Sequence, residues 1–406
     1  MTLTGQLTNT RTTPRRKVLV SGAGVAGTAL AFWLNRYGYA VTVVEKAGTL
    51  RSGGYPIDVR GTALEVVRRM GILPQLQEAH TDSRRFTFLD GDGREVASVN
   101  PHTVVGSVAG RDLEVRRADL TEALHTAVRD DVEFLFNDSI DTLDPFDHGV
   151  DVTFRAGSRR TFDMVFGADG LHSHTRELLF GTEKQFHRYL GYCFAVFTMR
   201  NTFGLSHEIT MWNTPGRAAA LYAVGDDDEV HAFLNFAHLD PPSDGFRAPE
   251  AQRNLFATTF ADAGWEVPGM IAAMRDADDL FIDVVSQIRM PRWSSGRVAL
   301  VGDAAYAPSF LTGQGSSLAL VGAYMLAGSL AGRDAAAGFA AYEHETRAFV
   351  TVNQDQIGKG GATLFPTTVQ ALKQRNDMLR NLSTMPATVG RPAHSALALP
   401  EFTSTR

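Results

Sequence analysis

Apolar residues are spaced with two different periods along this chain, and each period predicts a different kind of structure. Residues 18–20 form a short, wholly apolar run, which is typical of a parallel strand buried on both faces. An alanine- and leucine-rich stretch follows and predicts a helix that ends at Gly38, and residues 40–44 predict a second strand. This strand–helix–strand unit is typical of a dinucleotide-binding fold.

Helical spacing returns in later segments, whereas two long segments alternate with the period of a strand. Helices are expected at residues 62–70, 118–128, 316–330 and 367–382. Antiparallel strands are expected within residues 84–108 and at residues 193–199, 208–213, 218–224 and 230–236. Short buried strands at residues 162–166 and 297–301 indicate that the parallel sheet continues after each interruption.

These patterns predict an α/β fold with discontinuous domains. We expect a Rossmann-like domain with a parallel sheet, an α+β substrate domain with an antiparallel sheet, and a C-terminal helical segment. The expected boundaries are a flexible tail at residues 1–16, the nucleotide-binding domain at 17–83, 109–180 and 286–350, the substrate domain at 84–108 and 181–285, and the helical segment at 351–406.

Composition excludes several classes of function. The chain has 406 residues, of which 44% are hydrophobic and 21% charged, as in an ordinary globular protein. A formal net charge of −6, with no basic block, argues against nucleic acid or an anionic membrane surface as the main partner. The single cysteine, Cys193, excludes an intramolecular disulfide and a thiolate metal cluster. No zinc-binding HExxH pattern occurs either, so we expect no metal site.

The first residues of the chain resemble a loose tail and not a signal peptide. Residues 1–17 are polar and basic and have no apolar core of a signal peptide. The longest apolar stretch, residues 318–331, contains glycines and is too short to span a bilayer. We therefore expect a soluble, cytoplasmic protein.

A glycine-rich turn joins the first strand to the first helix. Gly22 allows the tight turn, Gly24 lets the backbone approach a pyrophosphate, and Gly27 lets the helix pack closely on the strand. Ala26 lies within the same motif, and the helix N-terminus favours the phosphate charge. Glu45, at the end of the second strand, is placed to accept hydrogen bonds from a ribose. An acid there disfavours a 2′-phosphate, so this turn is expected to bind FAD or NAD.

Two further motifs follow strands of the same predicted sheet. Residues 166–176 read FGADGLHSHTR, and residues 297–308 read RVALVGDAAYAP and are followed by Gly313-Gln314-Gly315. With these motifs the chain resembles the single-component (group A) FAD-dependent aromatic hydroxylases, the group that includes para-hydroxybenzoate hydroxylase. The three signatures of that family occur here in order and cover residues 18–330.

The resemblance implies that the Rossmann-like domain binds FAD. Asp169, Gly302 and Asp303 are then cofactor contacts, with Asp303 accepting hydroxyl groups of FAD at a strand end. The loop from Pro308 through Gly313, Gln314 and Gly315 is expected to face the flavin. Amides of this loop and the following helix dipole can stabilise negative charge on the reduced ring.

The same resemblance implies the chemistry. In that family, NADH or NADPH acts as a transient donor, and the reduced flavin reacts with oxygen to give a C4a-hydroperoxide. This species transfers oxygen to an electron-rich carbon of a small aromatic or polyketide-type substrate. Because the cofactor supplies the chemistry, no side chain is needed as acid or base. We therefore expect an FAD-dependent monooxygenase, acting as a monomer or homodimer with a small aromatic or polycyclic substrate and O2.

Two segments narrow the resemblance to the tetracycline-inactivating monooxygenases and related antibiotic-tailoring enzymes. They are residues 51–58, RSGGYPID, and residues 114–120, EVRRADL. On that match Arg51, Asp58 and Arg117 are expected to contact the cofactor. A role in antibiotic biosynthesis or resistance follows from the same match.

The substrate is expected to bind one face of the antiparallel sheet. His231, Phe233 and Asn235 share one face of the strand at 230–236, and the alternate residues Ala232, Leu234 and Phe236 are expected to form core. His231 also matches a substrate-side histidine of the tetracycline-inactivating enzymes.

Three other residues of the sheet are further candidates. Trp212 and Tyr222 are alternative substrate contacts, and Arg217 is the candidate partner of an anionic substrate. We expect an aromatic, apolar cavity between this sheet and the flavin, large enough for a fused-ring molecule.

Two alternatives share this fold. A flavin-dependent halogenase carries a Trp-x-Trp motif, but no two of the tryptophans here are two positions apart: Trp33, Trp212, Trp265 and Trp293. A non-catalytic FAD-binding protein is the other alternative, and the intact flavin-contact motifs argue against it.

Overall fold

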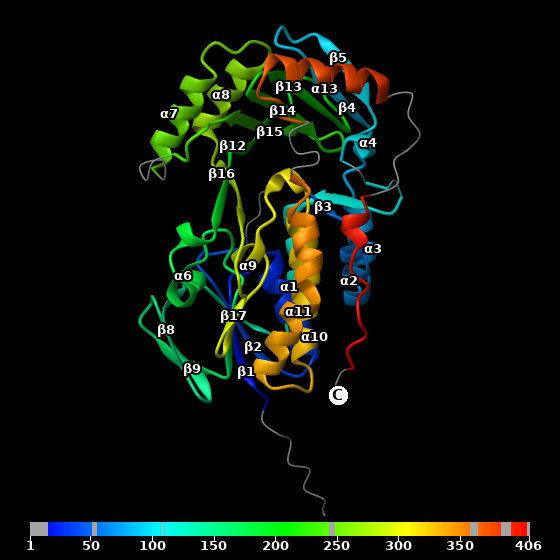
Figure 1. Cartoon of the computed structure of the whole chain (residues 1–406). Helices are drawn as coiled ribbons and strands as arrows, with labels where there is room; N and C mark the ends of the chain where they lie inside the picture. The colour runs from blue at the N-terminus through cyan, green and yellow to red at the C-terminus, as the bar shows by residue number, and fades with distance from the viewer. Residues whose placement is uncertain are drawn as a thin grey trace, which may run out of the picture.

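The computed structural model describes residues 15–50, 55–105, 107–108, 110–242, 248–357, 364–382 and 391–403. Two sheets form two layers of the molecule, one above the other in Figure 1. Residues 1–14 of the flexible tail expected at 1–16, and the expected cofactor contact Arg51, lie outside the described residues.

The lower sheet in Figure 1 carries the glycine-rich turn. It has six strands in the order β17-β18-β11-β1-β2-β7, and all neighbours are parallel except β17 and β18. These strands are β1 (Lys17–Ser21), β2 (Ala40–Glu45), β7 (Glu133–Phe136), β11 (Met164–Gly167), β17 (Ser294–Ser295) and β18 (Val298–Leu300). The three sequence motifs therefore follow β1, β11 and β18, which are adjacent in the sheet.

Both faces of this parallel sheet are covered, as its apolar strands predicted. Val18 and Val20 pack on the helical side, whereas Leu19 packs on the opposite side with strands of a small antiparallel sheet. The main helices are α1 (Val25–Arg36), α2 (Thr62–Met70), α3 (Leu73–Glu78), α5 (Arg117–Thr126), α10 (Gly315–Leu330) and α11 (Ala335–Gln354). The covering strands are β8 (Ile140–Phe146), β9 (Gly149–Phe154) and β10 (Arg159–Phe162), where no element had been predicted.

The upper sheet has seven strands, in the order β16-β12-β15-β14-β13-β4-β5. Its members are β4 (Arg85–Leu89), β5 (Glu95–Val99), β12 (His187–Arg200), β13 (Glu208–Thr214), β14 (Arg217–Ala223), β15 (Glu229–Ala237) and β16 (Phe281–Ile288). All neighbours are antiparallel except β4 and β13, which are parallel. The two segments expected to alternate thus pair with each other although they are about 120 residues apart, as in the pair Arg85–Glu208.

The two faces of the upper sheet have different surroundings. Helices α7 (Pro249–Thr259) and α8 (Val267–Asp276) cover one face, where Ala232, Leu234 and Phe236 are buried as expected. Helix α13 (Val369–Leu382) lies over β5 on the other face (Figure 1). The rest of that second face is turned toward the parallel-sheet layer, and it holds the cavity described below.

Several connections differ from the expected ones. Residues 101–105 were expected within a strand region, but they form helix α4 (Pro101–Val105). Pro101 occupies the first helical position, and the Asn100 side chain accepts the His102 amide at 2.9 Å, which together favour a helix start. Strands β3 (Pro56–Val59) and β6 (Leu113–Arg116) form a two-stranded sheet between the layers. The shorter helical elements are α6 (His174–Phe180), α9 (Asp303–Tyr306), η1 (Glu183–Gln185), η3 (Phe310–Thr312) and η5 (Pro392–Ser395).

The C-terminal segment is only partly helical. After η5, residues 396–403 run without a helix along α2 and α10. Tyr324 donates to the carbonyl of Pro400 at 2.6 Å, and Thr62 donates to that of Leu397 at 2.8 Å. Within the described residues, no helix is long and apolar enough to cross a membrane.

Candidate active site

The glycine-rich turn is shaped by close backbone contacts. Gly22 has φ +102, and a Cβ there would lie 2.6 Å from the carbonyl oxygen of Ala168. A Cβ at Gly27 would overlap the carbonyl oxygen of Gly22. The turn, the loop after β11 and helix α1 are therefore packed so tightly that these two positions need glycine.

Gly24 is different, because its side-chain position is open. A Cβ there would meet nothing within 4 Å, and φ is −76, a value that any residue adopts. Gly24 is the N-cap of α1, and no side chain caps the first amides of this helix. Uncapped amides beside open space at a helix N-terminus form a site suited to a phosphate group.

Glu45 borders the same turn. Its two carboxylate oxygens accept the backbone amides of Ala23 and Ala47, each at 2.9 Å. Each oxygen keeps a further lone pair, so the carboxylate can also accept hydroxyl groups of a ribose.

Asp303 lies close to the glycine-rich turn. It begins α9 directly after Gly302, whose φ is +65 and whose Cβ would lie 2.7 Å from the Cβ of Ala26. Asp303 is accessible to solvent, although many protein atoms lie around it. The loss of solvation caused by these atoms raises the pKa of Asp303, and the positive charge of Arg117 opposes the rise. Arg117 begins α5, so the N-termini of α1, α5 and α9 lie near one another. An accessible carboxylate enclosed by protein is typical of a ligand cleft.

The loop after β11 is held together by Asp169. Its carboxylate accepts the Ser173 hydroxyl at 2.5 Å and both the amide and hydroxyl of Thr175 at 2.9 Å. In this structure Asp169, expected as a cofactor contact, thus organises its own loop. Arg176, fully buried, donates to the carbonyl of Ala304 at 3.0 Å and so ties this loop to α9.

A histidine on the outer side of this loop joins the two layers. His172 lies 3.0 Å from the carboxylate of Glu183 and 3.2 Å from that of Asp283 on β16. These two carboxylates, Asp283 first, raise the pKa of His172 to about 9. The imidazolium therefore forms a charged clamp between the parallel-sheet layer and the upper sheet.

The expected flavin-facing loop lies between the layers and is conformationally strained. Ser309 has φ +80, which is rare for a residue with a side chain. Gly313 has φ +64, and a Cβ there would lie 2.7 Å from the Asp58 carboxylate. Gln314 is fully buried and its Oε1 has no hydrogen-bond partner, while Gly315 begins α10. The carbonyl oxygen of Pro308 accepts a hydrogen bond from the side-chain amide of Gln287 at 3.1 Å.

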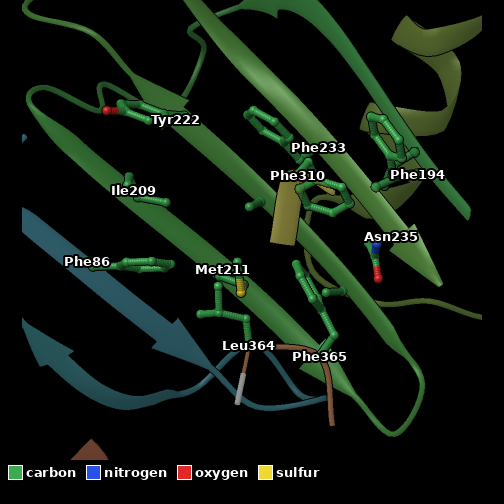
Figure 2. Close-up of a pocket in the computed structure, with 13 residues that line it drawn as sticks. Phe86, Phe194, Ile209, Met211, Tyr222, Phe233, Asn235, Phe310, Leu364 and Phe365 are labelled. Atoms are coloured by element: carbon green, nitrogen blue, oxygen red, sulfur yellow. The ribbon is translucent and has the colours of Figure 1, made fainter. Parts of the chain in front are cut away.

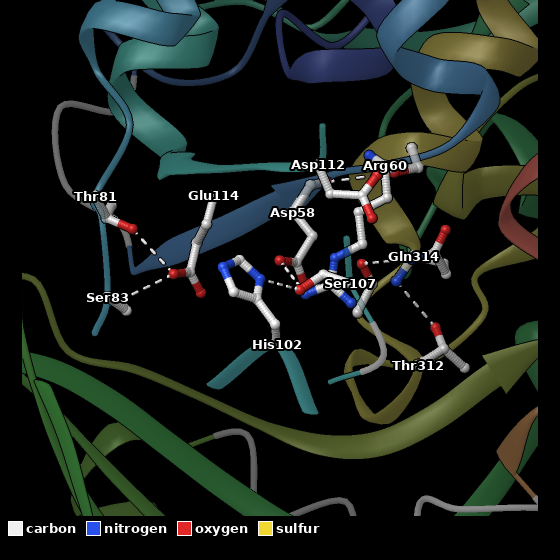
Figure 3. A network of polar contacts seen from close by, with 12 residues as sticks. Asp58, Arg60, Thr81, Ser83, His102, Ser107, Asp112, Glu114, Thr312 and Gln314 are labelled. Carbon is white, nitrogen blue, oxygen red and sulfur yellow. Dashed lines mark hydrogen bonds and ion pairs between the residues drawn. The ribbon is translucent and has the colours of Figure 1, made fainter. Parts of the chain in front are cut away.

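Beside this loop lies a network of polar side chains, shown in Figure 3. Asp58 forms an ion pair with the buried Arg60, and burial, opposed by Arg60, raises the pKa of Asp58 to about 6. Glu114 accepts the hydroxyls of Thr81 at 2.9 Å and Ser83 at 3.0 Å. A polar cavity of about 30 Å³ lies among these residues, enough for a water molecule. Asp58 was expected as a cofactor contact, and in this structure it pairs with Arg60. Sequence patterns did not predict the rest of the network, because its members come from separate loops and strands.

An apolar cavity of about 160 Å³ lies on the face of the upper sheet that α7 and α8 leave uncovered (Figure 2). Its lining comes from β4, β12–β15, the strained loop and the segment before α13. The lining residues are Phe86, Phe194, Ile209, Met211, Ala218, Ala220, Tyr222, Phe233, Leu234, Asn235, Phe310, Leu364 and Phe365.

The structure separates the five expected substrate-side residues. Phe233 and Tyr222 line the cavity. His231 lies further along β15, outside the lining, where burial and Arg116 lower its pKa to about 4.

Trp212 and Arg217 lie on the opposite face of the sheet, so, contrary to the expectation, they do not line the cavity. Trp212 packs in the core with α7 and α8, and Arg217 pairs with Asp262 at 2.5 Å. Side chains alternate along β13 and β14, and the face taken by these two residues is the one the helices cover.

Comparisons with known proteins agree with this geometry. The model of the FAD binding domain family matches residues 15–356. The chain belongs to the group A FAD-dependent monooxygenases. This flavin-dependent monooxygenase is 36% identical over 340 residues to a flavin-dependent monooxygenase of Legionella longbeachae, covering 83% of this chain and 87% of that protein.

Two other similar proteins extend over most of the chain. An uncharacterized Mycobacterium tuberculosis protein, Rv1260, is 46% identical over 342 residues, which cover 84% of this monooxygenase and 92% of that protein. The crystal structure of tetracycline destructase Tet(55) superimposes with a TM-score of 0.82 at 32% identity, covering 96% of this chain and 99% of that one. The predicted family and fold class are thereby confirmed.

The residues of the monooxygenase fit FAD. The open position at Gly24 leaves room for a pyrophosphate, and the enclosed but accessible Asp303 offers an acceptor for hydroxyl groups. The orphaned Oε1 of Gln314 offers a buried acceptor beside the strained loop. Reasoning from sequence missed Phe194, Phe310 and Phe365 as cavity residues, because they come from three separate segments of the chain.

Proposed function

We propose that this monooxygenase oxygenates a neutral aromatic or polyketide-type molecule bound in the apolar cavity, with NADH or NADPH as a transient electron donor. The observation that carries this proposal is the composition of the cavity. Of its 13 lining residues, none is charged and five are phenylalanine. Pockets of this kind bind apolar ligands and orient them through a few polar groups.

FAD is held by the residues around the N-termini of α1 and α9. Pyrophosphate binds the uncapped amides of α1 beside Gly24, and Glu45 and Asp303 accept hydroxyl groups of the cofactor. Arg117 adds positive charge near Asp303. When bound and reduced, the flavin supplies the chemistry that activates O2 and delivers oxygen to the substrate.

The chain's own contribution is to position the substrate and to exclude water. Phe310 belongs to the strained loop and also lines the cavity, so the substrate site and the expected flavin site share a wall. The apolar lining removes water from the reacting groups, which limits wasteful side reactions. No lining residue is a carboxylate, histidine or cysteine, so these side chains bind and orient the substrate without acting as acid or base.

The donor is expected to bind only briefly. The glycine-rich turn after β1 is the one pyrophosphate-binding turn of this type that the sequence contains, and FAD takes it. NADH or NADPH would then have no Rossmann turn of its own, so it would be held only weakly and for a short time.

The test is NAD(P)H oxidation by the FAD-loaded enzyme with a panel of neutral aromatic compounds and of anionic ones. We expect neutral aromatics to stimulate oxidation, with incorporation of one atom of 18O2 into the product by mass spectrometry. Poor substrates should release hydrogen peroxide in place of product. If no compound stimulates oxidation, or if stimulation comes without incorporated 18O, the proposal is wrong.

A further inference from the structure

Asn235 is a polar residue in the wall of the apolar cavity. It lies on β15 between Phe194 of β12 and Ala218 of β14, and its side chain is 4% exposed. Figure 2 shows its amide among the aromatic side chains of the cavity. The amide Nδ2 has no hydrogen-bond partner. A buried donor without a partner is costly, so the amide is poised to donate to a ligand.

The other polar residue of the lining is already engaged. The Tyr222 hydroxyl lies 2.6 Å from the Ser83 hydroxyl and 3.4 Å from that of Thr81, both outside the lining. Apart from Asn235 and Tyr222, every lining residue is apolar. The cavity therefore offers one orphaned donor in an apolar surrounding.

No cation of the described residues lines the cavity to receive an anion. Arg217 faces the helices on the other side of the sheet. Arg375 of α13 is buried on the cavity's side of the sheet but lies behind the lining, where it donates to Asn213 at 2.9 Å and stacks on Phe88 at 4.9 Å. The chemistry of the wall thus favours a neutral acceptor over a carboxylate.

Aromatic rings beside Asn235 favour a planar ligand. The rings of Phe194 and Phe310 lie 4.7 Å apart, and those of Phe310 and Phe365 lie 6.1 Å apart. These three side chains come from the sheet, the strained loop and the segment before α13. The three rings form an aromatic wall of the cavity beside one amide, which suits an aromatic group that carries a polar substituent.

We propose that the substrate is an aryl ketone or a related aromatic carbonyl compound, and that Asn235 selects it by donating Nδ2–H to the carbonyl oxygen. This inference rests on the proposed function, because it concerns the same cavity. The cavity of about 160 Å³ is similar to one that holds a single benzene ring, so a one-ring probe is suitable.

The test uses acetophenone and α-methylstyrene, two molecules of similar size and shape that differ in carrying a carbonyl oxygen or a CH2 group. Dissociation constants for the FAD-loaded protein are measured by ligand-observed NMR, with no donor present. Replacing Asn235→Leu keeps a similar volume and removes the amide. We expect the preference for acetophenone over α-methylstyrene to fall about tenfold in this variant, which matches the net contribution of one hydrogen bond between neutral groups.

Asn254→Leu is the matched control, because it makes the same change at an exposed residue of α7, on the face of the sheet opposite the cavity. It should keep the wild-type preference. If Asn235→Leu fails to fold or to retain FAD, Asn235→Ala provides the same comparison. The proposal is overturned if the preference is unchanged in the Asn235 variant that folds, or if benzoate binds the wild type more tightly than acetophenone.

Binding in this experiment needs neither NAD(P)H nor oxygen. Suppose that the preference for acetophenone depends on Asn235 but no aromatic compound stimulates NAD(P)H oxidation. The proposed oxygenase function is then wrong, and the role of Asn235 in binding stands. If aromatic compounds are oxygenated but the preference does not depend on Asn235, the oxygenase function stands and the role of Asn235 is wrong.

Discussion

Replacing Gly24→Ala separates the folding of the glycine-rich turn from its binding of FAD. The new Cβ meets no atom within 4 Å, and the backbone conformation at φ −76 suits alanine. Alanine is a poorer N-cap than glycine, so the free energy of unfolding of the FAD-free protein should fall by only about 0.5–1 kcal/mol. The methyl group nevertheless enters the space through which a pyrophosphate reaches the amides of α1.

Crowding at such a contact costs about 1–3 kcal/mol, so the dissociation constant for FAD should rise roughly 10- to 100-fold. Gly27→Ala should behave differently, because its Cβ would overlap the carbonyl oxygen of Gly22. That variant should lose both folding stability and FAD. The pair of variants thus distinguishes a glycine needed for packing from one needed for ligand approach.

The assays are urea unfolding of the FAD-free proteins and titration with FAD followed by the change in flavin fluorescence. Gly269→Ala is the control, because this exposed glycine of α8 has open space around it and lies far from the turn in sequence and in the fold. It should gain roughly 0.5–1 kcal/mol and bind FAD normally. A folded Gly24→Ala protein with wild-type affinity for FAD would refute the placement of the pyrophosphate at this turn.

Three further changes test the site and its supports. Asp303→Ala should lower the FAD content of the purified protein with little change in the unfolding of the FAD-free form, and an unchanged content would contradict its role. His172 has its pKa raised to about 9 by two carboxylates, so its stabilisation is complete below about pH 6.5 and is lost as the pH rises through 9. Because the side chain is half exposed, His172→Gln should cost about 1 kcal/mol at pH 6 and nothing at pH 10 by urea unfolding; an equal cost at both would refute the clamp. Gly322→Ala places a Cβ on the Tyr306 hydroxyl at the end of α9. This change should lower the free energy of unfolding by about 1–3 kcal/mol and also weaken FAD binding. Wild-type behaviour in both assays would show that α10 can shift freely.

Local sequence was sufficient to predict the elements around the glycine-rich turn. The apolar strands, the glycines and the helix that follows all lie within about 30 residues of one another, so short-range sterics and helix capping decide their structure. The alternation along β15 likewise predicted that Ala232, Leu234 and Phe236 form core, because side chains of a strand alternate between its faces whatever its partners are.

Which face of the upper sheet holds the cavity was decided only by tertiary structure. Trp212 and Arg217 were expected to contact the substrate, but they lie on the other face of their strands. Helices α7 and α8, which had not been predicted, cover that face. Phe310, Phe365 and Asn235 meet in the cavity from three segments of the chain. Contacts between distant segments depend on how whole elements pack, so a local pattern determines which residues share a face, and only the folded chain decides what that face meets.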